Sequence, residues 1–138
     1  MTRARGIGLR GLIAAGIWLA IFTAVGASEV ETVGPVFQQN LPNIAGKTFT
    51  VVRVDFAPGA RAEPHRHGQA FVFAYGLRGA VRSQLEGQPA QTFTVGQNWS
   101  EAPGIHHVLT ENASAREPAR LLVVFVADSG ASLKIDDR

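Results

Sequence analysis

Residues 59–68 read GARAEPHRHG and place two histidines, His65 and His67, directly after a turn segment that contains Gly and Pro. In an extended strand, residues i and i+2 point to the same face, so these two imidazoles can converge on one point. A third imidazole from a neighbouring strand would complete a three-nitrogen site of the kind that Zn, Fe, Mn, Ni or Cu accepts. Solvated loop histidines, or a hydrogen-bonded pair in the core, are the alternatives.

The remaining two histidines, His106 and His107, are adjacent and follow a Pro-Gly turn about forty residues further along. Adjacent strand residues face opposite ways, so at most one of them points at the metal in a regular strand. The two histidine clusters therefore predict one metal centre that is built between two strands.

The chain around these clusters is a succession of short runs rich in β-branched and aromatic residues, separated by Gly/Pro turns. This spacing predicts an all-β sandwich or barrel, and no segment after residue 28 has sustained helical periodicity. We expect one domain over residues 47–127, an N-terminal arm over 28–46 with a short edge strand at 33–37, and a polar tail over 128–138. The expected strands cover residues 47–56, 70–75, 80–85, 91–95, 106–111 and 119–127. Because the last of these is apolar on both faces, we expect one face to lie against a second subunit in a homodimer.

The first 27 residues are typical of a secretory signal peptide. They hold Arg3, Arg5 and Arg10, then an uncharged apolar run, and they end in the small residues 25–27 (VGA). An uncleaved membrane anchor is the alternative, since the run is just long enough to span a bilayer. Signal-peptide cleavage predicts a secreted, periplasmic protein.

The composition narrows the function classes further. The 138 residues carry a formal net charge of +2, but removal of the three N-terminal arginines leaves ten basic and eleven acidic residues, a net charge of −1. Nucleic acid and, after cleavage, membrane surfaces are therefore not expected as partners. The chain has no cysteine, which excludes a disulfide scaffold, a thiol nucleophile and a Cys-based metal site, and leaves histidine as the main nitrogen or sulfur ligand.

Two motifs resemble those of the cupin superfamily, in particular its small single-domain, type-2, quercetin-dioxygenase-like members. The first is Gly59-x5-His65-x-His67, with Gly79 closing the following strand pair, and the second covers residues 96–107 (GQNWSEAPGIHH). The resemblance implies a double-stranded β-helix, a jelly-roll barrel with the metal inside. It also implies that His65, His67 and His107 are the metal ligands, with His106 in place of His107 if a bulge shifts the register.

One departure from the family pattern concerns charge. The family usually has a ligand Glu that is separated from the second histidine by three or four residues, where this chain has Phe71 and Val72. A divalent ion held by three neutral histidines would keep its full charge, which favours an anionic substrate. Gln69, two residues after His67, is a candidate for a weak additional oxygen ligand.

Two further residues are candidates for catalytic roles: Tyr75 could offer its hydroxyl to a ligand, or could be a core or rim residue, and Glu101 could act on protons. Tyr75 follows Phe71 and Phe73 at i+2 spacing, so these three aromatics are expected on the interior face, where they would keep a pocket dry. Glu101 is the acid nearest to His107 in sequence and could act as an acid or base, or could be a solvated loop residue.

Together with the expected signal peptide, the resemblance implies an exported enzyme that binds one divalent ion, with Fe(II) favoured over Mn, Ni, Zn or Cu, and acts as a dioxygenase on a small organic molecule. The residues do not distinguish dioxygenase chemistry from isomerase or lyase chemistry at the same centre. A non-catalytic cupin module that binds a small ligand or a metal is the alternative.

Overall fold

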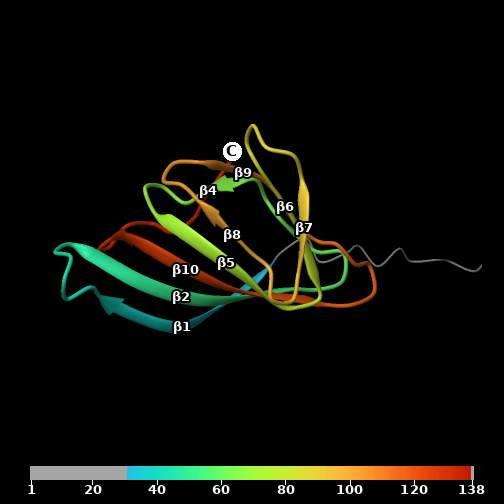
Figure 1. Ribbon diagram of the computed structural model, residues 1–138, viewed down its shortest axis with the longest axis horizontal. Helices are drawn as coiled ribbons and strands as arrows, with labels where there is room; N and C mark the ends of the chain where they lie inside the picture. The colour runs from blue at the N-terminus through green and yellow to red at the C-terminus, as the bar shows by residue number, and fades with distance from the viewer. Residues whose placement is uncertain (1–30, 138) are drawn as a thin grey trace, which may run out of the picture.

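The computed structural model describes residues 31–137, so the expected signal peptide lies outside the described residues. Within 31–137 the chain is all-β and forms eleven strands (Figure 1). None of the described residues forms a helix that is long and apolar enough to cross a membrane. The strands are β1 (Thr32–Asn40), β2 (Lys47–Phe56), β3 (Arg61–Ala62), β4 (His65–Arg66), β5 (Phe71–Arg78), β6 (Ala80–Leu85), β7 (Gln91–Thr94), β8 (Asn98–Glu101), β9 (His106–Asn112), β10 (Ala119–Asp128) and β11 (Ile135–Asp136).

The strands form two antiparallel sheets with a shared core. One sheet has the order β1-β2-β10-β5-β8, and the other has the order β11-β4-β9-β6-β7, with β3 also paired to β9. Apart from the consecutive pairs β1-β2 and β6-β7, neighbours in each sheet are not consecutive in sequence, as in a jelly roll. The expected all-β double-stranded β-helix is confirmed.

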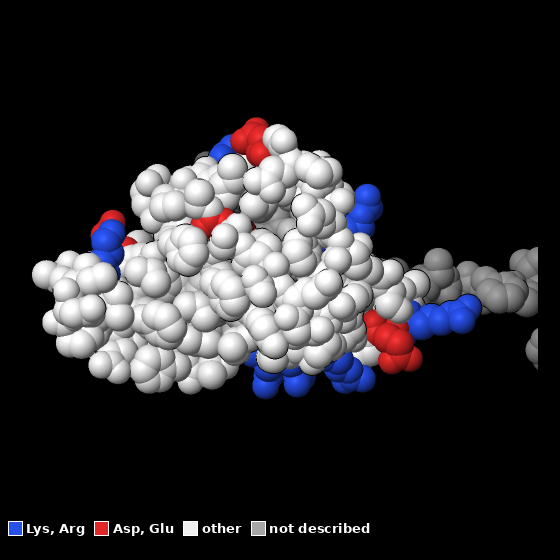
Figure 2. All heavy atoms as spheres, in the orientation of Figure 1, with Lys and Arg blue, Asp and Glu red and all other residues white. Residues whose placement is uncertain are grey.

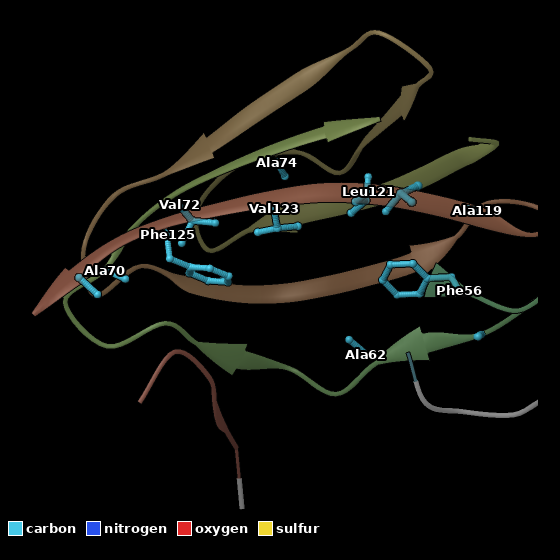
Figure 3. Close-up of a cluster of buried hydrophobic side chains, with 12 residues drawn as sticks. Phe56, Ala62, Ala70, Val72, Ala74, Ala119, Leu121, Val123 and Phe125 are labelled. Atoms are coloured by element: carbon cyan, nitrogen blue, oxygen red, sulfur yellow. The ribbon is translucent and has the colours of Figure 1, made fainter. Parts of the chain in front are cut away.

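β10 lies at the centre of the first sheet, between β2 and β5. Its alternate residues Leu121, Val123 and Phe125 are buried and face the second sheet (Figure 3). Phe56 of β2 and Val72 of β5 are each 1% exposed and complete this part of the core. The long apolar run that the sequence shows at this position is thus the strand on which the core is built.

In residues 71–75 of β5, the face that points inward is the opposite of the one expected. Val72 and Ala74 are buried, whereas Phe71 is 45% exposed and Phe73 and Tyr75 are only partly buried. The expectation of an aromatic interior face on this strand is therefore wrong. The alternation of large and small apolar residues gave no sign of which face is inward, and the core is filled by Phe56 and Phe125 from other strands.

The four strands that were not expected share a feature. β3, β4 and β11 have two residues each, and β8 is a polar run (NWSE), so none has an apolar alternation to indicate it. β11 brings the C-terminal segment back against β4, with Ile135 opposite Arg66 and Asp136 opposite His65. The segment expected as a polar tail is thus part of the second sheet beside the first histidine cluster.

Candidate metal centre

Two strands of the second sheet bring the histidine clusters together. β4 and β9 are antiparallel, with His65 opposite His107 and Arg66 opposite His106. His65 and His107 are 5% and 3% exposed, and His67 follows β4 on the same side. Ligand atoms of His65, His67 and His107 all lie within 4.8 Å of one another. The structure therefore places the three histidines of the resemblance at one point inside the barrel.

The hydrogen bonds of His65 and His67 fix which nitrogen of each ring faces this point. His65 Nδ1 lies 2.6 Å from the carbonyl oxygen of Glu63, and His67 Nδ1 lies 2.5 Å from that of Leu133. A carbonyl can only accept, so both Nδ1 atoms carry the proton and donate. The two Nε2 atoms then present lone pairs to each other at a distance of 3.2 Å. Nothing in a pair of neutral rings stabilises this arrangement, whereas a cation between the rings does.

The distance between the two Nε2 atoms is also one that a metal ion requires. Nitrogens bound to one zinc ion at about 2.0–2.1 Å with tetrahedral geometry lie about 3.3 Å apart. In addition, burial lowers the pKa of His65 to about 4, and the pKa of His67 is lowered by burial despite the nearby charge of Glu101. Both rings are therefore neutral at neutral pH, which is the form that binds metal.

His107 is held from the opposite side. Its Nε2 lies 2.7 Å from both the Ser83 and Thr110 hydroxyls, and its Nδ1 lies 3.2 Å from Glu101 Oε1. The register between β6 and β9 shifts at Leu85, so a bulge in β9 at residue 108 lets His107 and Thr110 point inward together. Sequence reasoning missed Ser83 and Thr110, because a bulge changes which residues share a face.

Glu101 lies in the interior, at the end of β8, and is 2% exposed. Its Oε1 accepts a hydrogen bond of 3.0 Å from Trp99 Nε1 and lies 3.2 Å from His107 Nδ1, and its Oε2 lies 3.6 Å from His67 Nε2. Burial raises the pKa of Glu101, but the contacts with His107, His67 and Trp99 outweigh burial and leave the pKa below its usual value. A buried carboxylate is therefore directed into the histidine cluster.

Two polar atoms at this point lack hydrogen bonds. Within residues 31–137, Glu101 Oε2 and His107 Nδ1 are buried side-chain atoms without a hydrogen-bond partner. Buried polar atoms are almost always paired, so an unpaired oxygen and an unpaired nitrogen in one cluster indicate a missing ligand. The donor set and these two atoms fit a divalent metal ion.

The other residues expected at the site lie elsewhere. Gln69 is exposed and does not line the cavity beside the histidines. Tyr75 is on the outward face of β5. His106 points away from its neighbour His107, and its Nε2 lies 2.7 Å from Asp137 Oδ2. The structure thus brings together four of the expected residues and separates three from them.

The cluster opens onto a cavity of about 170 Å³. Most of the lining is apolar and includes Val52, Val54, Ala74, Val123 and Phe125. Lys134 also lines the cavity, and its Nζ lies 2.6 Å from Glu31 Oε1 and 2.9 Å from Asp136 Oδ1. The histidines therefore sit at one wall of a small, mainly apolar chamber.

Known structures resemble this fold at low sequence identity. The DMSP lyase DddQ from Ruegeria pomeroyi DSS-3 superposes with a TM-score of 0.57 and 20% identity, over 64% of this chain and 42% of the lyase. Recombinant oxalate oxidase in complex with glycolate gives a TM-score of 0.61 and 19% identity, over 80% of this chain and 57% of the oxidase. An uncharacterized conserved protein with a double-stranded β-helix domain, from Klebsiella pneumoniae subsp. pneumoniae MGH 78578, gives 0.60 and 18%, over 83% of this chain and 89% of that protein.

This chain thus spans less than two thirds of the lyase and of the oxidase. At these identities the likeness shows a shared fold and says nothing about a shared reaction. No curated protein sequence matches the chain at a significant level. A family model described as a cupin domain matches residues 52–125, which is more than half of the chain. With its two-sheet barrel and its inward-facing histidines, this chain belongs to the cupin family.

Proposed function

We propose that this protein is a metal-dependent enzyme that acts on a small organic acid or phenol. His65, His67 and His107 hold one divalent ion, with Fe(II) favoured and Mn, Ni, Zn or Cu as alternatives. The observation that carries the proposal is the pair of Nε2 lone pairs that face each other at 3.2 Å inside the barrel. A bound divalent ion supplies Lewis acidity at this point, and iron in addition supplies redox chemistry with oxygen.

The size of the cavity limits the substrate. A cavity of about 150 Å³ in a protein core holds one benzene molecule, and the chamber here measures about 170 Å³. A molecule of one ring, or a short-chain acid, therefore fits in this volume. The apolar side chains of the lining exclude water from the metal and strengthen its electrostatic interactions with a substrate.

The positive charge of the centre favours an anionic or ionisable substrate. A protein of similar fold, an oxalate oxidase, was solved with glycolate, so small acids are the first compounds to test. The reaction types to test first are oxidase-like or dioxygenase-like chemistry and lyase chemistry.

A binding module without turnover is the second candidate, and the placement of two residues favours it. Tyr75 lies outside the cavity, and both carboxylate oxygens of Glu101 are directed at the histidine cluster. Tyr75 is thus not placed to contact a ligand in the cavity, and Glu101 is not free to act as an acid or base. A substrate that carries its own ionisable group would remove the need for them.

Oxygen uptake separates the two candidates. Protein loaded with Fe(II) under anaerobic conditions should consume oxygen with at least one member of a panel of small acids, phenols and diketones, and the His67→Ala variant should not. Binding of a panel member to the loaded protein, seen by calorimetry without uptake or product, would support the binding module instead.

Export and dimer formation are proposals as well. Cleavage after residue 27 would give a periplasmic protein. The intact mass of the protein from a periplasmic extract tests this cleavage.

The proposal of a dimer rests on the outward face of β10, which carries Leu122, Val124 and Val126, none of them fully buried. Uncharged residues also cover the surface over β1, β2 and β10 in the view of Figure 2, with charged side chains at its rim. Light scattering on the purified protein should give twice the chain mass.

A further inference from the structure

We propose that Glu101 is the fourth protein ligand of the metal centre. It would supply from β8 the carboxylate that the first histidine motif lacks. This inference rests on the proposed function, because it requires that the three histidines bind an ion.

The register of two strands places Glu101 where a carboxylate is missing. β5 and β8 are antiparallel neighbours, and Glu101 lies directly opposite Val72. Residues opposite each other in an antiparallel pair point to the same face, with Cβ atoms about 4.5–5.5 Å apart. Val72 is one of the two positions at which the family usually has its ligand Glu, and both Val72 and Glu101 are buried inside the barrel. The carboxylate therefore reaches the same level of the barrel from the adjacent strand.

The distances among the four side chains are those that ligands of one ion keep. His65 Nε2 lies 3.2 Å from His67 Nε2, Glu101 Oε2 lies 3.6 Å from His67 Nε2, and Glu101 Oε1 lies 3.2 Å from His107 Nδ1. Two ligand atoms at about 2.0–2.2 Å from one ion lie about 2.9–3.5 Å apart at octahedral or tetrahedral angles. These three distances are at or close to that range, and the ligand atoms of the three histidines all lie within 4.8 Å of one another.

The surroundings of the carboxylate give independent support. Among residues 31–137, the basic side chains within ion-pair distance of Glu101 are His67 and His107, and no Lys or Arg is among them. A buried carboxylate without a permanent cation is costly. Trp99 Nε1 satisfies one lone pair of Oε1, which leaves Oε2 directed at His67 and unpaired. A divalent ion at this point would neutralise the charge of the carboxylate. It would also be a bonding partner for both Glu101 Oε2 and His107 Nδ1.

This assignment changes the charge of the centre. With three neutral histidines the bound ion keeps +2, and with Glu101 as a ligand the centre has +1. When a singly charged centre binds a monoanion, such as a monocarboxylate or a phenolate, the resulting complex has no net charge in the apolar cavity. The assignment thus narrows the proposed substrate class to monoanions.

The test uses Co²⁺ as the probe and the full protein with Glu101→Gln, which keeps the size of the side chain and removes its charge. Glu111→Gln is the matched control, because Glu111 is a half-buried strand residue that pairs with Arg82 outside the site. We expect the control to bind Co²⁺ like the wild type, with the same visible absorption spectrum. We expect Glu101→Gln to lower the affinity more than about hundredfold, beyond the range for residues that only orient a ligand, and to change the spectrum.

Infrared difference spectra of the wild type with and without Co²⁺ provide a readout that needs no variant to fold. Metal binding should shift carboxylate bands, and these bands should be absent from the difference spectrum of Glu101→Gln. A double exchange, Val72→Glu with Glu101→Val, should restore Co²⁺ binding because it moves the carboxylate to the opposite residue on the same face.

The outcomes separate this inference from the proposed function. Wild-type protein that binds no Co²⁺ would overturn both. Wild-type protein that binds Co²⁺ without a shift of carboxylate bands, or Glu101→Gln with unchanged affinity and spectrum, would overturn the role of Glu101 alone and leave a three-histidine centre.

Discussion

His65 and His67 face each other through unprotonated Nε2 atoms 3.2 Å apart, because each ring donates its Nδ1 proton to a backbone carbonyl. The carbonyls come from distant parts of the chain, Glu63 just before β4 and Leu133 near the C-terminus. This arrangement presents two lone pairs to the same point and prepares the site for a cation before one binds.

Metal binding should therefore stabilise the fold. Zn²⁺ at a concentration of about 100 times its dissociation constant should raise the free energy of unfolding by about 2.7 kcal/mol. For a domain of this size that corresponds to a rise in Tm of about 10 °C. Thermal unfolding of metal-free protein with and without Zn²⁺ measures the shift. His67→Ala should remove it, and an equal shift in this variant would place the binding elsewhere.

The metal-free protein should lose stability as the pH falls. The pKa of His65 is about 4 in the folded chain and about 6.5 when unfolded. Between these values the unfolded chain binds a proton that the folded chain does not, so stability decreases toward low pH by up to about 1.4 kcal/mol per pH unit. Urea unfolding in EDTA from pH 7 to pH 4.5 measures this slope. His65→Asn should reduce this slope and leave the part that comes from His67, whose pKa is also lowered by burial. An equal slope in both proteins would show that His65 does not contribute.

The two adjacent histidines should differ in their effect on metal binding. His107→Ala removes one of the three rings of the histidine cluster, so Co²⁺ binding should fall below detection or weaken by several orders of magnitude. His106→Ala removes a ring that pairs with Asp137 on the other face of β9, so the affinity should stay within about threefold. Calorimetric titration of both variants checks the assignment. A larger loss with His106→Ala would mean that His106, and not His107, faces the barrel interior.

The C-terminal segment should support the site through His67. Deletion of residues 133–138 removes β11 and the Leu133 carbonyl that accepts the His67 Nδ1 proton. Loss of such a partner typically lowers metal affinity by about 10–100-fold. The deletion protein should keep its β-sheet circular dichroism and bind Co²⁺ more weakly. Asp137→Asn, which affects only the His106 contact, is the control and should bind as the wild type does.

Much of the barrel could be predicted from the sequence, because its long strands carry their own pattern. β2 and β6 have the predicted bounds, and β10 is one residue longer than predicted. Each of these runs is bounded by turn residues and has β-branched or aromatic side chains. The short strands β4 and β11 could not be predicted, because two residues carry no periodicity and their pairing depends on the rest of the sheet.

The candidate site was only partly visible in the sequence. The spacing of His65 and His67 indicated that they share a face, and the motif resemblance selected His107. The position of Glu101 depends on the pairing of β8 with β5, which sequence separation does not reveal. The signal that could have found it is the i, i+2 spacing of Trp99 and Glu101, which places an aromatic ring and a carboxylate on one face of a short strand.

The metal content of the purified protein tests the central claim most directly. Protein produced in medium with trace metals and purified without added metal or chelator should contain about one divalent ion per chain by mass spectrometry of the elements. The His65→Ala and His67→Ala variants, purified in parallel, should contain almost none. Wild-type protein with no more bound metal than these variants, also after incubation with Fe(II), Zn²⁺ or Mn²⁺, would contradict the existence of the metal centre.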